Sequence, residues 1–292
     1  MRLMAVAAAC LLAALGAGSA AAQQRPPPQV VSYGFWSPSY ALAQQRVMNQ
    51  ALASLQPRVP GKRNVYVLSA ALYGQHVFEH EAAGAANVLQ SHFGAAGHTI
   101  VLSNNHAVGA PPFAAASPAN LQAALGRLAE LMDKENDVAV IFLTSHGAQR
   151  AGVLGFETVS GVSTEPLSDY QLAPGRLRGS LDAAGIKNRI IILSACFSGQ
   201  FIPTLQDPNT IVLTAASAER TSFGCQAQND WTYFGDAMFN AALPKSNSLL
   251  AAFDAAKKQI SAEETQGNLT PSQPQIFVGD QAGKFLKEIE QR

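Results

Sequence analysis

The sequence has few cysteines and no excess of charge of either sign. Among its 292 residues there are three cysteines, and 20 basic side chains balance 20 acidic ones, so the formal net charge at pH 7 is zero. A chain without a basic excess lacks the electrostatic attraction that nucleic acids and anionic membranes require. Neither class of partner is therefore expected.

The sequence also lacks an apolar run long enough for a confident membrane span, which needs about 20 residues. Its most apolar stretch, residues 1–22, has an early Arg2, a run rich in alanine and leucine, and three final alanines. This is the pattern of a secretory signal peptide cleaved before Gln23. We expect a secreted or periplasmic protein with no stable membrane insertion after cleavage. An uncleaved anchor and lipidation of Cys10 are the alternatives.

The rest of the chain is apolar enough for a substantial core, and it contains no internal repeat. An N-terminal extension, residues 23–60, is proline-rich at first and then compatible with a helix from residue 38 to 55. One large domain, residues 61–292, follows. Within it, strands are predicted at 64–70, 99–103, 137–145, 189–195, 210–216 and 275–278, with a hairpin and loop over 150–173. Helices are predicted at 75–93, from 118 (with Leu121, Leu125, Leu128 and Leu131 buried), at 174–184, near 232–242 and 246–264, and at the C-terminus.

This alternation predicts an α/β fold. Several of the strands are apolar on both faces, which is typical of a mainly parallel sheet covered by helices on both sides. Sites in such sheets form beyond the carboxyl ends of the strands.

Two of the predicted strands lead into reactive residues. The strand 137–145 is followed by His146 and Gly147, and the strand 189–195 is followed by Cys196. If these strands are parallel neighbours, a thiol and an imidazole meet at one edge of the sheet, which is the minimum for cysteine nucleophile chemistry. The alternatives are that Cys196 is a small core residue, or that it forms a disulfide with Cys225.

The chemistry explains why these residue types belong together. A free cysteine has a pKa near 8.5 and is mostly protonated at neutral pH, so a histidine is needed to take its proton. A tetrahedral intermediate then needs fixed N–H donors, which the backbone amides of Gly147 and Cys196 can supply. The run Phe197-Ser198-Gly199 permits a tight turn that exposes the sulfur.

Three short segments resemble the C13 cysteine peptidases, the legumain-like family of the caspase clan. They are TSHG (144–147), LSACFSG (193–199) and TAASAERTSFGC (214–225). The resemblance extends from about residue 64 to residue 280 and is strongest to the bacterial branch. The family includes asparaginyl endopeptidases and the catalytic subunit of the GPI transamidase.

The resemblance implies a caspase-like three-layer α/β/α sandwich with a mainly parallel central sheet and no metal or other cofactor. It implies that Cys196 is the nucleophile, that His146 is the general acid and base, and that a thioester acyl-enzyme forms. The amides of Gly147 and Cys196 would form the oxyanion hole. The partner would be a peptide or protein substrate, and the sequence gives no indication of an oligomeric state.

The resemblance also suggests residues for the pocket that holds the substrate's P1 side chain. Thr221 and Ser222 match one wall of this pocket, and Asp236 matches an acid at its floor. Ser194 occupies a position where eukaryotic members have glutamate. These members also have an asparagine that orients the histidine; here Gln75 is the nearest substitute, and no arginine can be matched to the pocket. Asparagine specificity is therefore not carried over, and an acid alone would favour lysine or arginine.

Other functions remain open at this point. A transpeptidase or transamidase would form the same acyl-enzyme, and a non-catalytic binding protein could keep the caspase-like fold. An unrelated thiol hydrolase on a flavodoxin-like sheet would lack the segment 214–236. His76 and His80, four residues apart on a predicted helix, are compatible with a metal but have no clear third ligand. The loop 148–173, which is rich in glycine and serine, is a candidate for substrate contacts or internal cleavage.

Overall fold

The computed structural model of the chain describes residues 38–104, 112–149, 153–155 and 171–291. The chain divides into two units, residues 1–33 and 34–292, and all of the described residues lie in the second. The predicted signal peptide lies outside the described residues, as do residues 23–37 of the predicted extension and most of the loop 148–173.

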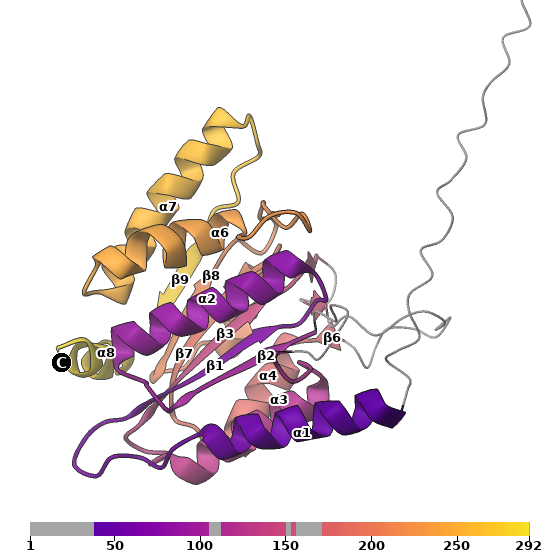
Figure 1. Ribbon diagram of the computed structural model, residues 1–292. Coiled ribbons are helices and arrows are strands. Elements are labelled where there is room, and N and C mark those ends of the chain that lie inside the picture. Colours follow the sequence, from indigo (N-terminus) through magenta and orange to yellow (C-terminus); the bar gives the residue numbers. More distant parts are fainter. Residues whose placement is uncertain (1–37, 105–111, 150–152, 156–170, 292) are drawn as a thin grey trace, which may run out of the picture. The chain divides into compact units, whose positions relative to one another are not determined.

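The second unit is built on a six-stranded sheet in which five strands are parallel (Figure 1). Only the last pair, β8 and β9, is antiparallel. The prediction of a mainly parallel sheet is therefore confirmed. The order across the sheet is β2 (Thr99–Ser103), β1 (Val65–Ala71), β3 (Val138–Thr144), β7 (Asn188–Ser194), β8 (Thr210–Thr214) and β9 (Gln275–Val278).

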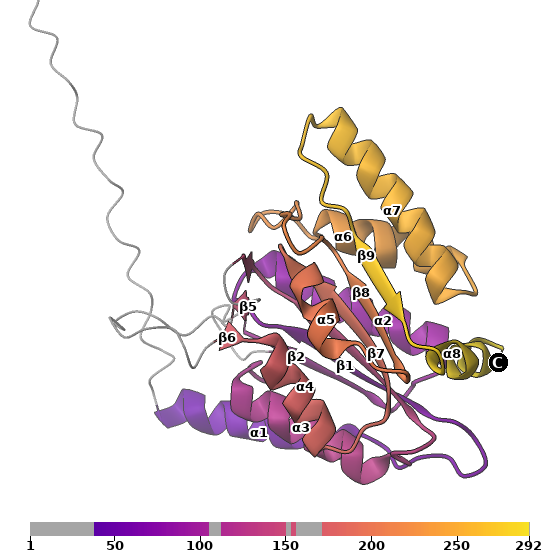
Figure 2. The same cartoon turned by 180° about the vertical axis from the view of Figure 1, so that it is seen from behind.

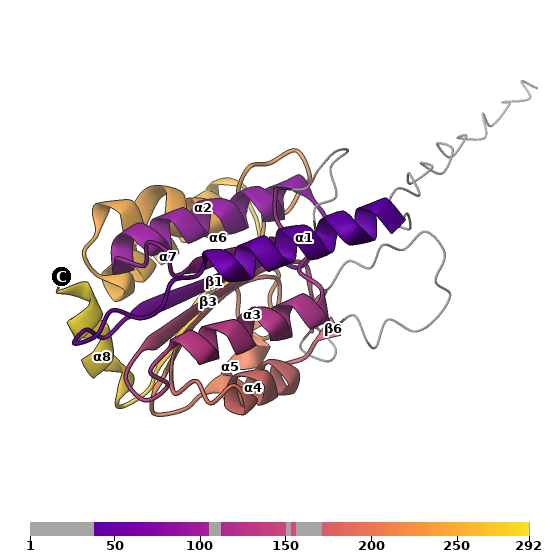
Figure 3. The ribbon, with the colours of Figure 1, turned by 60° about the horizontal axis from the view of Figure 1, so that its bottom comes forward.

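Helices cover both faces of this sheet (Figure 3). On one face lie α2 (His76–Phe93), α6 (Tyr233–Gly235), the π-helical segment η4 (Asp236–Ala242) and α7 (Leu249–Gln266). The opposite face carries α3 (Pro118–Leu131), α4 (Pro174–Ala183) and α5 (Ile202–Leu205), which Figure 2 shows from behind. The arrangement is a three-layer α/β/α sandwich.

Successive residues of the central strands enter two different cores. In β3, Val140 and Phe142 pack under α2 and α7, whereas Ile141 and Leu143 pack under α3 and α4. Side chains of a strand point alternately to its two faces, so a strand buried on both faces must be apolar throughout. This is why β1, β3, β7 and β8 are fully buried.

Two terminal helices complete the cores. Helix α1 (Pro38–Ser54), which lies within the predicted extension, places Met48 in the core under α3. Helix α8 (Ala282–Glu290) adds Phe285 and Ile289 to the core under α7. Of the described helices, none combines the length and the apolarity that a membrane span requires.

Local signals account for most of the helix boundaries. Ser117 caps α3 by accepting a hydrogen bond from the Asn120 amide, as its sequence predicts. Helix α7 begins at Leu249, later than predicted, because Ser248 caps it in the same way. Leu131, predicted to be buried, is half-buried at the end of α3.

The predicted helix 232–242 is not a regular α-helix. Only three residues, α6, are α-helical; they are followed by the π-helical η4 and by the 3₁₀ turn η5 (Leu243–Lys245). π-helical turns are rare and frequently occur at functional sites. The other short elements are the 3₁₀ turn η3 (Ser198–Phe201) and a small antiparallel sheet of β4 (Gly147–Ala148), β5 (Val153–Gly155) and β6 (Gln171–Leu172).

Candidate functional site

The candidate site lies where three neighbouring parallel strands end. Thr144, the last residue of β3, pairs in register with Ala71 of β1 and with Ser194 of β7. Because Thr144 and Ser194 are opposite each other, His146 and Cys196, each two residues further along the chain, follow the same level of the sheet. The sheet grows to one side of β1 through β2 and to the other side through β3, β7 and β8. Ligands of open α/β sheets bind at such a reversal of strand order.

Gly147 and Cys196 approach each other closely through their backbones. A Cβ atom built on Gly147 would overlap the Cys196 carbonyl oxygen and lie 3.2 Å from the Cys196 nitrogen. Glycine is needed here because any side chain would push the two strand ends apart. The amides predicted to form the oxyanion hole thus belong to adjacent backbone segments.

His146 is enclosed by side chains from the segment that joins β1 to α2 and from the first turn of α2. Its Nε2 lies 3.2 Å from Oε1 of Gln75, and its ring contacts Tyr73 and Phe78 edge-on, with centroids 4.6 and 5.0 Å away. This burial lowers the pKa of His146 below its ordinary value of 6.5, because an enclosed imidazole is less readily charged. When Nε2–H donates to Gln75, Nδ1 keeps the lone pair that can accept a proton.

The Cys196 thiol lies against Ser222. Its Sγ accepts a hydrogen bond from the Ser222 amide at 3.3 Å and lies 3.6 Å from both Ser222 oxygens. The next residue, Phe197, has a φ of 57°, which is unfavourable by about 1 kcal/mol for a residue with a side chain. Its amide donates to the Arg220 carbonyl at 2.8 Å, which holds the turn. Cys196 is consequently half-buried, whereas β7 before it is fully buried.

Two of the residues predicted to line the P1 pocket follow β8 and reach the site. Ser222 contacts the sulfur of Cys196 as described, and Thr221 beside it is exposed. Both come from the segment whose carbonyl at Arg220 holds the turn after Cys196. Their assignment to the pocket stays a prediction.

The other two candidates for this pocket lie deeper or farther along the chain. Ser194 is buried, and its hydroxyl donates to Glu81 at 2.9 Å. Asp236 lies on η4, and its carboxylate accepts hydrogen bonds from Asn240 at 2.7 Å and from Gln259 of α7 at 3.3 Å. The structure thus places Asp236 among helix side chains, and its role in the pocket stays a prediction.

Glu81 was not among the predicted site residues, yet it lies beneath the two strand ends. Its fully buried carboxylate accepts hydrogen bonds from the hydroxyls of Thr144, Ser194 and Thr232. Gly235 packs against it so closely that a Cβ there would overlap the carboxylate. Burial raises the pKa of Glu81 to about 7, although the three hydroxyl donors act in the opposite direction.

Helical spacing could have revealed Glu81. It follows Val77 by four residues and precedes Ala85 by four, so it belongs to the apolar stripe of α2. A carboxylate within such a stripe must find hydrogen-bond donors in the interior. The sequence does not show where those donors are.

The two cysteines that the structure describes form no disulfide with each other, and the histidine pair binds Asp230. Cys196 and Cys225 are both free thiols. His76 lies 3.0 Å from the Asp230 carboxylate, and His80 contacts the Asp230 carbonyl at 2.8 Å. Within the described residues there is no group of three or more His, Cys, Asp or Glu side chains suited to a metal ion.

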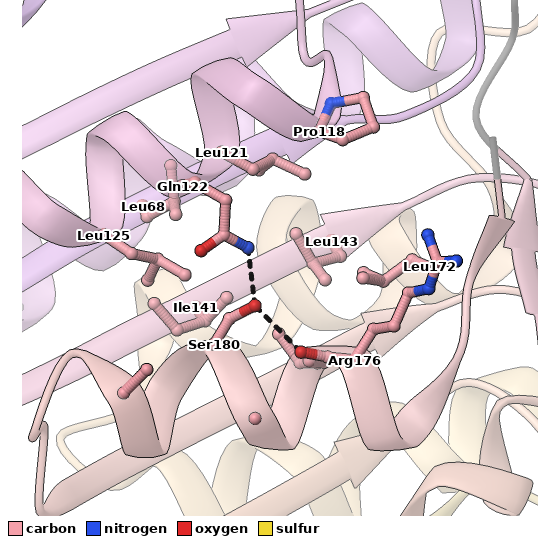
Figure 4. Close-up of a pocket in the computed structure, with 13 residues that line it drawn as sticks. Leu68, Pro118, Leu121, Gln122, Leu125, Ile141, Leu143, Leu172, Arg176 and Ser180 are labelled. Atoms are coloured by element: carbon pink, nitrogen blue, oxygen red, sulfur yellow. Dashed lines mark hydrogen bonds between the residues drawn. The ribbon is translucent and has the colours of Figure 1, made fainter. Parts of the chain in front are cut away.

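An apolar cavity of about 360 Å³ lies away from these residues, between α3 and α4 (Figure 4). Leucines of both helices and of the sheet line it, among them Leu121, Leu143 and Leu177. At its polar side Gln122 donates to Ser180, and Ser180 donates to the Arg176 carbonyl. None of the residues predicted for catalysis or for the P1 pocket lines this cavity, although Leu172, at the end of the loop 148–173, does.

Comparison with known proteins agrees with the geometry. Residues 104–284, more than half of the chain, match the family model described as the peptidase C13 family. Caspase-1 from Spodoptera frugiperda has a similar fold, with a TM-score of 0.50 and 12% identity over 77% of this chain and 92% of that one. A structure described as pro-sf-caspase-1 gives a TM-score of 0.47 at 12% identity, over 74% and 87% of the two chains. No curated protein sequence matches the chain. The predicted caspase-like fold is confirmed.

Proposed function

Because this chain belongs to the peptidase C13 family of cysteine peptidases, we propose that it is an endopeptidase that acts through His146 and Cys196. The observation that carries the proposal is that His146 and Cys196 each follow, by two residues, the registered pair Thr144 and Ser194 at the ends of adjacent strands, with Gly147 against the Cys196 backbone. A thiol and an imidazole beside paired backbone amides are the groups that acyl transfer requires.

In the first half of the proposed reaction, the peptide carbonyl is attacked and the amine leaves. His146 takes the proton of the Cys196 thiol on Nδ1 while its Nε2–H remains bound to Gln75. The sulfur then attacks the carbonyl carbon, and the amides of Gly147 and Cys196 stabilise the oxyanion. When the C–N bond breaks, His146 returns the proton to the leaving amine and a thioester remains.

In the second half, water is activated by His146 and attacks the thioester. The C–S bond breaks, the acid product leaves, and the proton returns to the thiolate. The lowered pKa of His146 favours this role, since a neutral imidazole is the form that accepts a proton. If an amine replaced water at this step, the same acyl-enzyme would give transpeptidation or transamidation.

The test uses the reduced protein from Gln23 onward and a peptide library varied at P1, assayed from pH 4 to pH 8. Cleavage that disappears in Cys196→Ala would support the proposal.

We expect His146→Ala to lower kcat by about 10² to 10⁴, the usual value of general acid–base catalysis. An added amine that becomes joined to the product would instead identify a transferase. If no peptide is cleaved and a thiol-directed electrophile leaves Cys196 unlabelled, the fold serves binding.

The same assay addresses the P1 pocket. If Asp236 acts in this pocket without a compensating arginine, peptides with lysine or arginine at P1 will be preferred. Asp236→Asn would then weaken that preference. An unchanged P1 preference in Asp236→Asn would remove this residue from the pocket.

Export is a separate part of the proposal. The pattern of residues 1–22 supports a signal peptide that directs the protein to the periplasm or outside the cell. Mass spectrometry of the protein recovered from its native compartment should find Gln23 at the N-terminus. Recovery of a chain that still begins at Met1 would contradict cleavage.

A further inference from the structure

The carboxylate of Glu81 joins three separate segments of the site. It accepts hydrogen bonds from Thr144 at the end of β3, from Ser194 at the end of β7 and from Thr232 before α6. The Ser194 and Thr232 hydroxyls also lie 3.2 Å apart. We propose that Glu81 is a positioning residue, which holds these three segments in the arrangement that the His146/Cys196 reaction requires. This inference rests on the proposed function.

Each hydroxyl that Glu81 binds lies on a segment that carries a group of the site. Thr144 precedes His146 by two residues, and Ser194 precedes Cys196 by two. Thr232 ends the segment that contains Ser222. A displacement of the carboxylate would therefore move the imidazole, the thiol and the segment beside the thiol relative to one another. Displacements of about 1 Å are enough to lower a rate by about 10².

The side chain of Glu81 has little freedom to respond to such a loss of partners. It is 0% exposed, and Gly235 closes the space around its carboxylate. Thr232 also accepts a hydrogen bond from the Gly235 amide at 3.0 Å, which fixes the start of α6. The carboxylate, the helix cap and the strand ends thus form one connected network.

The charge of Glu81 determines whether all three hydrogen bonds can exist together. An ionised carboxylate only accepts, so three hydroxyls can donate to it. A protonated carboxyl has one O–H that must donate, so at least one of the three hydroxyls must reorient. Since burial raises the pKa of Glu81 to about 7, this change falls in the neutral range.

The groups that face Glu81 are mostly without charge. From β3, β7 and the start of α6 they are hydroxyls, and from the α6–η4 side the nearest group is Gly235. The titratable neighbour is Cys225, whose pKa is raised first by burial and then by the charges of Cys196 and Glu81. The Asp236 carboxylate is directed to Asn240 and Gln259. Glu81 is therefore the group in this network that titrates near pH 7.

The test compares Glu81→Gln with the wild-type protein in kcat and KM from pH 5 to pH 9. Gln has nearly the same shape but only one acceptor oxygen, so it resembles the protonated side chain at every pH. We expect kcat of Glu81→Gln to be lowered about tenfold at pH 8, with a much smaller effect on KM. The two kcat profiles should converge below pH 6, where wild-type Glu81 is itself neutral.

Glu264→Gln is the matched control, because Glu264 is also a buried glutamate, whose side chain accepts from the Ser272 amide at 2.9 Å. We expect its kcat profile to run parallel to that of the wild type. A loss in Glu81→Gln that is the same at every pH would show a merely structural effect and overturn the inference, as would no loss. A wild-type protein that neither cleaves peptide nor reacts with iodoacetamide at Cys196 would overturn the proposed function, and the inference with it.

Discussion

His146 meets three side chains that all come from residues 73–78, which span the end of the β1–α2 connection and the first turn of α2. Gln75 occupies the N-cap position of α2, yet its side chain makes no capping hydrogen bond. It lies instead 3.2 Å from Nε2 of His146. The orientation of the Gln75 side chain is therefore determined by a tertiary contact and not by helix capping. Its partner in that contact is His146, the candidate general base.

We expect Gln75→Ala to lower kcat on the order of 10-fold, because the imidazole loses the acceptor that selects its tautomer. The neighbouring rings of Tyr73 and Phe78 remain, so KM and the unfolding midpoint should change little. Steady-state kinetics and thermal unfolding check this. Gln122→Ala, on α3, serves as the control and should leave kcat unchanged. An equal loss in both variants would refute an orienting role for Gln75.

The raised pKa of Glu81 leads to a prediction of how the stability of the protein depends on pH. Its pKa is raised from 4.5 to about 7 in the folded state, so the folded state holds a proton that the unfolded chain has released. The contribution of Glu81 to stability is full below pH 4.5 and is lost as the pH rises through 7. This loss corresponds to about 3 kcal/mol.

The wild type should therefore lose about 3 kcal/mol of stability relative to Glu81→Gln between pH 4 and pH 8, as measured by urea unfolding at each pH. A constant difference between the two proteins would indicate that Glu81 keeps one charge state throughout. Ionised Glu81 thus costs stability in the same range in which we expect it to support catalysis. Such a conflict is common at functional sites.

At the scale of a single element, β3 lies between a buried carboxylate, Asp137, at its start and the candidate general base, His146, beyond its end. Asp137, immediately before β3, is 0% exposed. Its carboxylate accepts hydrogen bonds from Arg58, from the Asn64 amide and from the Asp133 amide. These bonds fix the position of β3 beside β1, and so the point at which its far end presents His146.

We expect Asp137→Ala to destabilise the fold by about 3 kcal/mol, because it leaves buried donors without an acceptor. Glu135→Ala is the matched control: Glu135, two residues before Asp137, pairs with Lys187 immediately before β7, but its side chain is 72% exposed. Exposed pairs contribute about 1 kcal/mol or less. Denaturant unfolding of both variants checks the contrast, and similar losses would contradict the anchoring role of Asp137.

At the scale of the whole molecule, the chain before β1 takes part in the fold. Met48 of α1 is buried in the core under α3, and the half-buried side chains of Val47 and Leu52 pack beside it. Helix α1 precedes residue 61, where sequence composition suggested that the domain begins. Its contribution can be measured directly.

A chain that begins at residue 55 should be less stable than one that begins at residue 34. The shorter chain loses the burial of Met48, which contributes about 1.5 to 3 kcal/mol for this side chain alone. The urea midpoint should therefore fall, and the shorter chain should expose an apolar patch beside α3. Equal midpoints for the two chains would show that α1 rests on the fold without stabilising it.

The sequence by itself determined the layered fold and the two residues at its edge. Continuous apolar strands alternating with helices are typical of a mainly parallel sheet covered on both faces, and the parallel direction of such strands places their carboxyl ends at one edge. His146 and Cys196 each follow such a strand, so the local pattern places both at this edge of the sheet, whereas the adjacency of β3 and β7 and their register come from the tertiary structure. The family followed from short segments around the same residues.

Only the tertiary structure decided what surrounds these residues. Gln75 meets His146 across 71 positions of sequence, and Glu81 meets Ser194 and Thr232 across 113 and 151. Periodicity shows that Glu81 is buried, but a buried carboxylate takes whichever donors the packed elements bring to it. Those donors come from strand ends and a helix cap that are brought together only when the layers pack.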